Sequence, residues 1–166
     1  MNNTQLTIQT EEKKLIACAF TGHRNLPKYF DEEIIKKAVE KCIKKGVEIF
    51  YNGVAKGFDL LSAKVVLSLK KKYPNIKLIA CIPCYNQEKN YNEEEKKDYI
   101  EVLSKADEKI YVSDREYFKG CMQKRDRYLV DKADILIAYL KEDTGGTAFT
   151  VNYCKKKYPF KEILFL

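Results

Sequence analysis

The feature of this sequence that most constrains its fold is a regular alternation of short apolar runs with longer amphipathic ones. Residues 15–20 (LIACAF) and 134–140 (DILIAYL) are almost continuously apolar, as strands are when helices cover both faces of a parallel sheet. Between such runs, apolar residues recur at helical spacing, as in residues 31–45. This repeated alternation predicts an α/β domain with a mostly parallel sheet and helices on both faces.

The same pattern locates the individual elements. Gly46 and Pro74 are typical helix stops after the first two helices. We predict one Rossmann-like, three-layer domain over residues 13–166, preceded by a flexible tail at residues 1–12. Strands are expected at residues 15–20, 47–51, 76–82, 109–112, 134–140 and 161–166, and helices at residues 31–45, 58–72, 93–105, 120–132 and 147–157.

Composition narrows the class of protein further. The chain has 166 residues, 45% of them hydrophobic, which suits one globular core. No apolar run approaches the roughly 18–20 residues of a membrane span, and the polar start lacks the order of a signal peptide. The six cysteines fall mostly inside apolar segments, which favours free buried thiols in the cytoplasm over a disulfide framework.

The net charge of +7 leaves two interpretations open. A basic chain is typical of a protein with a nucleic acid partner. However, the lysine clusters at residues 44–45, 70–72 and 155–157 fall where helices are expected to end, and cations there interact favourably with the helix dipole. We favour solvated helix ends, and we expect no membrane partner.

Three of the loops that follow predicted strands combine glycine with hydroxyl or amide side chains. Thr21-Gly22-His23-Arg24 follows the first strand, residues 52–59 follow the second, and Gly145-Gly146-Thr147 comes after the fifth. Ligands of open parallel sheets bind beyond the carboxyl ends of the strands, where glycine permits close backbone approach and helix N-termini attract anions. Neither G-x-G-x-x-G nor the P-loop motif is present, which argues against an ordinary dehydrogenase or P-loop ATPase.

At these loops the chain resembles the YpsA-like branch of the SLOG superfamily, which also holds DprA-type DNA-processing proteins and LOG-type phosphoribohydrolases. The resemblance runs from about Leu15 to Leu166. Five pieces carry it in order: Thr21-Gly22-His23-Arg24, Gly53-x-Ala55-x-Gly57-x-Asp59, Pro83-x-x-x-Gln87, residues 123–131 (QKRDRYLVD), and Gly145-Gly146-Thr147.

The resemblance implies a Rossmann-like fold whose glycine-lined pocket binds nucleotides or nucleotide-derived signals, such as ADP-ribose species. LOG-type enzymes carry Gly-Gly-x-Gly-Thr-x-x-Glu with a catalytic glutamate, whereas Thr150 stands at that position here. A threonine cannot replace a carboxylate in that role, so we assign no catalytic residue. The predicted ligand-binding residues are Thr21, Gly22, His23, Arg24, Gly53, Gly57, Asp59, Pro83, Gln87, Arg125, Asp126, Gly145, Gly146 and Thr147.

Several of these side chains have more than one interpretation. His23 is either a general base or, as we favour, a hydrogen-bonding and packing residue. Arg24 meets either an anion or a surface carboxylate. Asp59 either contacts a ribose or stabilises the start of a helix. Asp126 either repels phosphate or accepts a ribose hydroxyl. Of Arg125 and Arg127, we expect one to point into the pocket and the other to solvent.

Two other patterns have structural as well as functional interpretations. Cys81-Ile82-Pro83-Cys84 has the spacing of a redox motif, but we expect a structural role. We predict no metal site, because no second pair of ligands has zinc spacing. The aromatic middle segment, with Tyr85, Tyr91, Tyr99, Tyr111, Tyr117 and Phe118, either stacks on a base or packs the helices and a subunit contact.

The leading hypothesis is a module that binds a nucleotide-like small molecule, as a sensor or a sequestering protein, without a further cofactor. One alternative is an N-glycosidic-bond hydrolase by analogy with the LOG branch. The other is a single-stranded DNA-binding protein by analogy with the DprA branch. A homodimer or homotetramer is expected.

Overall fold

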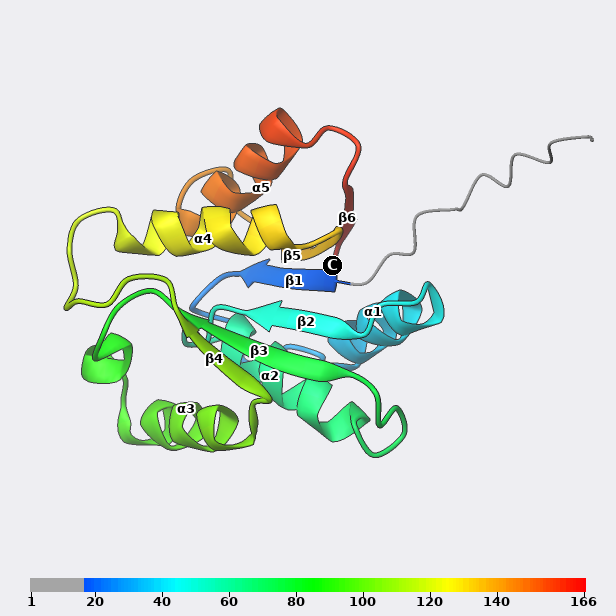
Figure 1. The fold of residues 1–166 in the computed structure, drawn as a ribbon, viewed down its shortest axis with the longest axis horizontal. Coiled ribbons are helices and arrows are strands. Elements are labelled where there is room, and N and C mark those ends of the chain that lie inside the picture. Colours follow the sequence, from blue (N-terminus) through cyan, green and yellow to red (C-terminus); the bar gives the residue numbers. More distant parts are fainter. Residues whose placement is uncertain (1–16) are drawn as a thin grey trace, which may run out of the picture.

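The computed structural model describes residues 17–166. The predicted tail at residues 1–12 and the first two residues of the first predicted strand lie outside this range. The described chain forms one α/β domain built on a six-stranded sheet in the order β4-β3-β2-β1-β5-β6, with every neighbouring pair parallel (Figure 1). The predicted fold class is therefore confirmed.

The elements follow the predicted alternation closely. The strands are β1 (Ala17–Gly22), β2 (Ile49–Asn52), β3 (Lys77–Ile82), β4 (Glu108–Tyr111), β5 (Ile135–Tyr139) and β6 (Glu162–Phe165). The helices are α1 (Glu33–Lys44), α2 (Phe58–Leu69), α3 (Glu93–Lys105), α4 (Cys121–Lys132) and α5 (Gly146–Lys157), with a short 3₁₀ helix, η1 (Gln87–Asn90).

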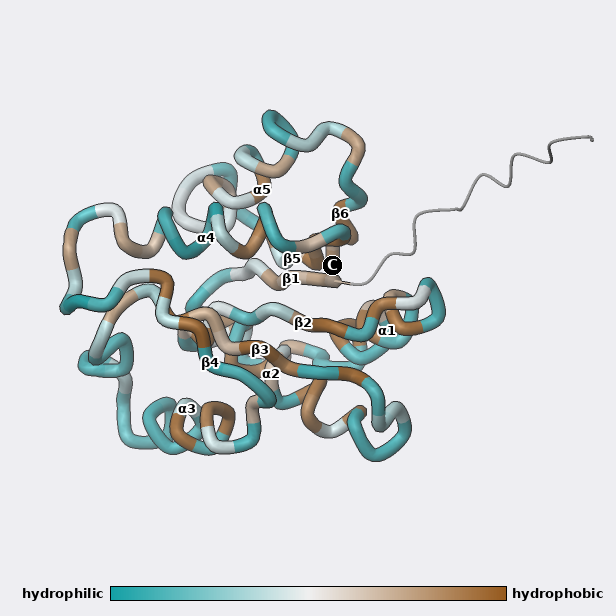
Figure 2. Tube along the Cα trace, in the orientation of Figure 1, coloured by the Kyte–Doolittle hydropathy of each residue, from teal (hydrophilic) through white to brown (hydrophobic). Residues whose placement is uncertain are grey.

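Helices cover both faces of the sheet because successive residues of each strand point to opposite sides. Phe20 of β1 packs with residues of α1, α2 and α3 on one face, whereas its neighbour Ala19 packs with residues of α4 and α5 on the other. Figure 2 shows the hydrophobic residues concentrated along the central strands. All six cysteines are free and buried, as predicted. Among the described residues, no helix is long and apolar enough to cross a membrane.

Most element boundaries lie within one or two residues of the predicted ones, and two differences are larger. Helix α2 ends at Leu69 rather than at residue 72, because Lys72 and Tyr73 both donate their N–H groups to the Leu69 carbonyl and so form a tight turn before Pro74. Helix η1 was not predicted, and it follows Asn86, whose φ of 56° reverses the chain.

The strand order places the carboxyl end of β1 at a topological switch point. From β1 the chain moves outward through β2, β3 and β4, and then returns to place β5 on the other side of β1. The loops after β1 and β5 therefore separate from each other at the sheet edge, which is where ligands of open α/β sheets bind.

Candidate functional site

A cleft of about 470 Å³ opens at this switch point, within the size range of small-molecule sites. The loops after β1 and β5 line it, together with residues from the starts of α2, α4 and α5. Figure 1 shows that α4 and α5 begin at the same edge of the sheet as the arrowhead of β1. We call this cavity the switch-point cleft.

The loop after β1 is fixed by contacts to two other segments. The His23 carbonyl accepts a hydrogen bond from the Phe58 N–H at 3.1 Å, which ties the loop to the start of α2. The His23 Nε2 atom accepts from the Lys141 N–H at 2.8 Å, and its ring packs edge-on against Tyr139. A side chain at Gly22 would overlap the Phe58 ring. These contacts agree with the hydrogen-bonding and packing role that we favoured for His23, which stays a prediction.

Two helix N-termini reach the switch-point cleft without a side-chain cap. Helix α5 begins after Gly145, whose φ is 93°, and helix α4 begins after Gly120, whose φ is also 93°. An added Cβ at Gly145 or Gly146 would meet no atom within 4 Å, so the backbone there is open to a ligand. Because the first N–H groups of a helix lack intrahelical acceptors and carry the positive end of the dipole, both ends favour an anion in the cleft.

The loop after β2 is held by buried polar contacts. Asn52 is fully buried; its Nδ2 donates to the Asp59 carbonyl (2.9 Å) and to Ser62 Oγ (3.0 Å), while its Oδ1 accepts from the Val54 N–H (2.8 Å). The last bond holds Val54 at a φ of 48°, a conformation that is unfavourable for a β-branched residue. The sequence offered a signal for Asn52, since a polar residue ends an apolar strand before a glycine.

Arg125 projects from α4 into this loop and is only 4% exposed. Its guanidinium donates to the Gly53 carbonyl and, at 3.4 Å, to the Cys81 carbonyl, while its Nε pairs with Asp126 at 2.9 Å. An added Cβ at Gly53 would lie 2.6 Å from Arg125 Nη1 and 2.8 Å from Asp59 Oδ2. A side chain at Gly53 would therefore force the Arg125 guanidinium or the Asp59 carboxyl to shift. Through its bonds to the Gly53 and Cys81 carbonyls, Arg125 links the ends of β2 and β3.

Asp59 is a buried carboxyl on the wall of the switch-point cleft, 6% exposed. Burial raises its pKa to about 7; the Arg125 guanidinium lowers the pKa, and the neighbouring Asp126 carboxylate raises it. Its Oδ2 accepts from the Ala55 N–H at 3.3 Å. Near neutral pH, Asp59 therefore alternates between a hydrogen-bond donor and an anion.

The structure brings most of the predicted ligand-binding residues together. Gly53 and Gly57 instead support the wall: Gly57 has a φ of 81°, and a Cβ there would overlap the Arg24 carbonyl. Pro83 is buried, and Gln87 lines a second hollow, described below. The switch-point cleft itself is lined by Thr21, Gly22, His23, Arg24, Asp59, Arg125, Asp126, Gly145, Gly146 and Thr147.

Sequence reasoning missed other lining residues, among them Lys119 and Glu142. They lie in irregular loops, where no periodic pattern indicates which side chains face a cavity. Thr150 does not line the cleft; it is buried, and its hydroxyl donates to the Gly146 carbonyl of its own helix at 2.9 Å.

Fold and cleft together define a Rossmann-like domain with its candidate site at the switch point. The family model described as the YspA SLOG family matches residues 18–163. The chain belongs to this family.

The chain is also similar in sequence to individual proteins. The chain is 30% identical over 138 residues to the SPbeta prophage-derived protein YoqJ of Bacillus subtilis, covering 76% of this chain and 81% of YoqJ. It is 34% identical over 130 residues to a UPF0398 protein of Halalkalibacterium halodurans (74% and 68% covered) and 28% identical over 131 residues to the UPF0398 protein YpsA of Bacillus subtilis (78% and 73%).

Solved structures share the fold. DNA processing protein A from Helicobacter pylori, whose structure was described for its single-stranded DNA binding mode, superimposes with a TM-score of 0.65 at 19% identity. The match covers 92% of this chain and 65% of that protein. DprA from Streptococcus pneumoniae gives a TM-score of 0.65 at 16% identity, with 92% and 50% covered.

Proposed function

We propose that this protein binds a nucleotide or a nucleotide-derived molecule, such as ADP-ribose, in the switch-point cleft. The observation that carries the proposal is the convergence of two uncapped helix N-termini and the exposed Arg24 on one cleft. Each of these features attracts phosphate: the helix ends through free N–H groups and the dipole, and Arg24 through a forked, permanent charge.

The carboxylates of the cleft suit the sugar rather than the phosphate. Asp59, Asp126 and Glu142 line the same cavity, and ionised carboxylates are hydrogen-bond acceptors for hydroxyl groups. A ligand that carries both phosphate and ribose therefore matches the cleft better than inorganic phosphate does.

The proposed role is binding without turnover, as a sensor or sequestering protein in the cytoplasm. At the position of the LOG-type catalytic glutamate, Thr150 is buried and its hydroxyl is bonded to the Gly146 carbonyl. Neither a water nor a ribose can be activated by that hydroxyl. Assembly into a homodimer or homotetramer stays a prediction.

The test is calorimetric titration of the purified protein with AMP, ADP, ADP-ribose and NAD, together with chromatography for released base. We expect binding without release, and at least a tenfold loss of affinity in Arg24→Ala, because a hydrogen bond to a charged group contributes about 1.5–3 kcal/mol. Lys28→Ala is the matched control, since it removes the same charge from the same loop at a residue that lines neither hollow. If Arg24→Ala and Lys28→Ala bind nucleotide with equal affinity, Arg24 does not contact the ligand. Release of free base would establish hydrolysis instead.

A second candidate is single-stranded DNA binding. It is favoured by the net charge of +7 and by the fold shared with DNA processing protein A from Helicobacter pylori. This candidate predicts an affinity for an oligodeoxythymidylate that falls steeply with salt, because each neutralised phosphate releases a counterion. Absence of binding at low salt would exclude it.

A further inference from the structure

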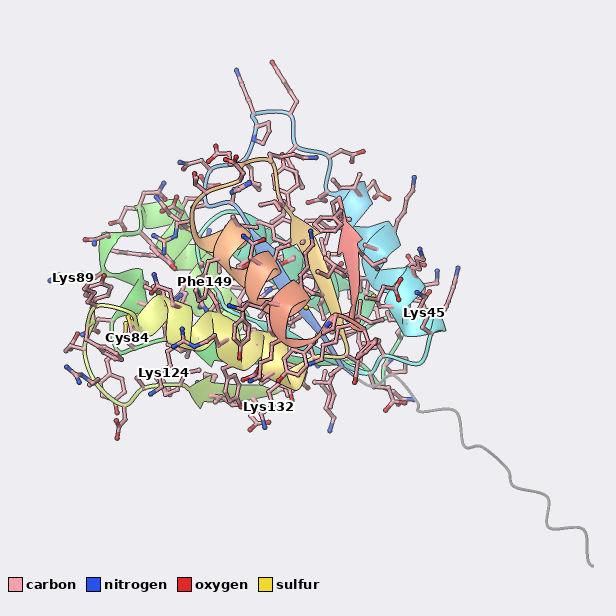
Figure 3. The ribbon with its side chains drawn as sticks, turned by 90° about the horizontal axis from the view of Figure 1, so that it is seen from above. Lys45, Cys84, Lys89, Lys124, Lys132 and Phe149 are labelled. Carbon is pink, nitrogen blue, oxygen red and sulfur yellow. The ribbon has the colours of Figure 1, made fainter. Side chains whose placement is uncertain are left out.

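A larger hollow of about 1260 Å³ adjoins the switch-point cleft. We call it the outer groove. The two cavities share Arg24, Tyr117 and Met122 as lining residues, so they meet at a common boundary. Figure 3 shows Cys84 and Lys89, which both line the outer groove, at the end of the molecule where α4 begins. A ligand in the cleft can therefore extend directly into the groove.

The outer groove is rich in positive charge. Arg24, Lys56, Lys89 and Lys96 line it, against the two carboxylates of Glu88 and Glu116. Glu116 already accepts a hydrogen bond from Asn86 Nδ2 at 2.8 Å. With Arg24 at the boundary, the cationic side chains continue from the cleft into the groove, as a phosphate-linked ligand requires.

The groove also presents exposed aromatic rings. Tyr117 is 67% exposed and Tyr85 is 43% exposed. The loop that carries Tyr117 is tied to the segment after β3, because the Tyr85 N–H donates to the Arg115 carbonyl at 2.9 Å. Tyr91 differs, since its hydroxyl is bonded to the Val54 carbonyl at 3.1 Å. Exposed tyrosines beside cations form the surface on which bases stack.

Gln87 gives an independent indication of a ligand. It lines the outer groove and is 8% exposed. Its Nε2 donates to the Gly53 carbonyl at 3.0 Å, while its Oε1 is the one buried side-chain oxygen or nitrogen of residues 17–166 without a hydrogen-bond partner. A buried acceptor without a donor is unfavourable by about 1–3 kcal/mol. A base amino group or a ribose hydroxyl in the groove would supply that donor.

We infer that the outer groove is the second half of the ligand site and binds the second nucleoside of a dinucleotide whose phosphates lie at Arg24. This inference rests on the proposed function, and it narrows the ligand class to molecules with two nucleosides joined through phosphate. The second base stacks on Tyr85 and Tyr117 and bonds to Gln87.

The test compares two probes that share one half, ADP and P1,P2-di(adenosine-5′) diphosphate, by calorimetric titration. We expect the dinucleotide to bind at least ten times more tightly than ADP. Tyr85→Ala should weaken the dinucleotide by roughly 5- to 150-fold, the equivalent of about 1–3 kcal/mol per stacked base, and should leave ADP unchanged. Tyr85→Phe should retain the affinity, and Tyr29→Ala, at an exposed tyrosine outside both hollows, is the control.

The outcomes separate this inference from the function on which it rests. Equal affinities for the two probes, or an unchanged dinucleotide affinity in both Tyr85→Ala and Tyr117→Ala, would overturn the role of the outer groove while nucleotide binding stands. Binding of neither probe would overturn both. A third arm uses oligodeoxyadenylates of about two and about eight residues. If only the longer strand binds tightly, the groove binds nucleic acid, and the inference that its ligand is a free dinucleotide is wrong.

Discussion

Replacement of the buried carboxyl Asp59 by asparagine should stabilise the protein in a pH-dependent manner. The pKa of Asp59 is raised from 3.8 to about 7, chiefly by burial. Between these two values the unfolded chain carries the ionised carboxylate, whereas the folded chain holds the proton. The folded state therefore binds more protons, and its stability falls as the pH rises through this interval.

The magnitude follows from the two pKa values. Each pH unit in the interval changes the free energy of unfolding by about 1.4 kcal/mol, so the unfavourable contribution grows from near zero below pH 4 to about 4 kcal/mol above pH 7. Between pH 5 and pH 8 it grows by about 3 kcal/mol. The asparagine side chain of the Asp59→Asn variant would not titrate, and its Oδ1 can accept the Ala55 N–H that Asp59 accepts now.

The assay is urea-induced unfolding of wild type and Asp59→Asn at pH 5 and pH 8, followed by circular dichroism. The free energy of unfolding of Asp59→Asn should exceed that of wild type by about 3 kcal/mol more at pH 8 than at pH 5. The dependence of this free energy on urea concentration should be equal in the two proteins. Asp114→Asn, at an exposed aspartate that lines neither hollow, gives the effect of removing one surface carboxylate. A difference between wild type and Asp59→Asn that is the same at both pH values would refute the assigned burial of the charge.

Further predictions concern the walls of the switch-point cleft. Nucleotide affinity of the wild type should rise as the pH rises through about 7, because ionised Asp59 accepts a hydrogen bond from a ribose hydroxyl; the same titration with Asp59→Asn should show a weaker dependence. Gly146→Ala should fold like wild type, since its Cβ meets no atom and alanine favours a helix, yet bind nucleotide at least tenfold more weakly because the methyl group occupies the cleft. Gly53→Ala should lose about 1–3 kcal/mol in urea unfolding, because its methyl group overpacks the site against the Arg125 guanidinium and the Asp59 carboxyl; no loss would contradict this.

Much of the fold could be predicted because local sequence determines it. Helix α3 runs from Glu93 to Lys105 as predicted, and its start is fixed by a capping box in which Asn92 and Glu95 bond to each other's backbone N–H groups. The order of the strands could not be predicted, since several apolar runs have similar composition. The position of β5 beside β1, with Tyr139 opposite Gly22, depends on packing of α4 and α5 against the sheet.

The candidate site was predictable at its glycine loops and less so elsewhere. Gly22 and Gly145 carry a local signal, because few other residues permit such turns and close contacts. Arg125 was predicted only through the family resemblance: its place in a helix leaves its direction open, and only the structure shows that its guanidinium donates to the Gly53 carbonyl. Tyr117 lies in the loop between β4 and α4, where no periodicity indicates which cavity it faces.

The unfavourable features of the described chain gather in the wall between the two hollows. Val54 has a φ of 48°, Asp59 is a buried carboxyl, and Gln87 has an unpartnered Oε1. Gln87 of η1 and Arg125 of α4 both donate hydrogen bonds to the Gly53 carbonyl, so both helices contact the same loop. Strained and unsatisfied groups persist where the surrounding contacts enforce them, and they cluster at binding sites. A ligand that supplies a donor to Gln87 and a hydroxyl to Asp59 would relieve two of these features together, so its binding should stabilise this wall more than the rest of the domain.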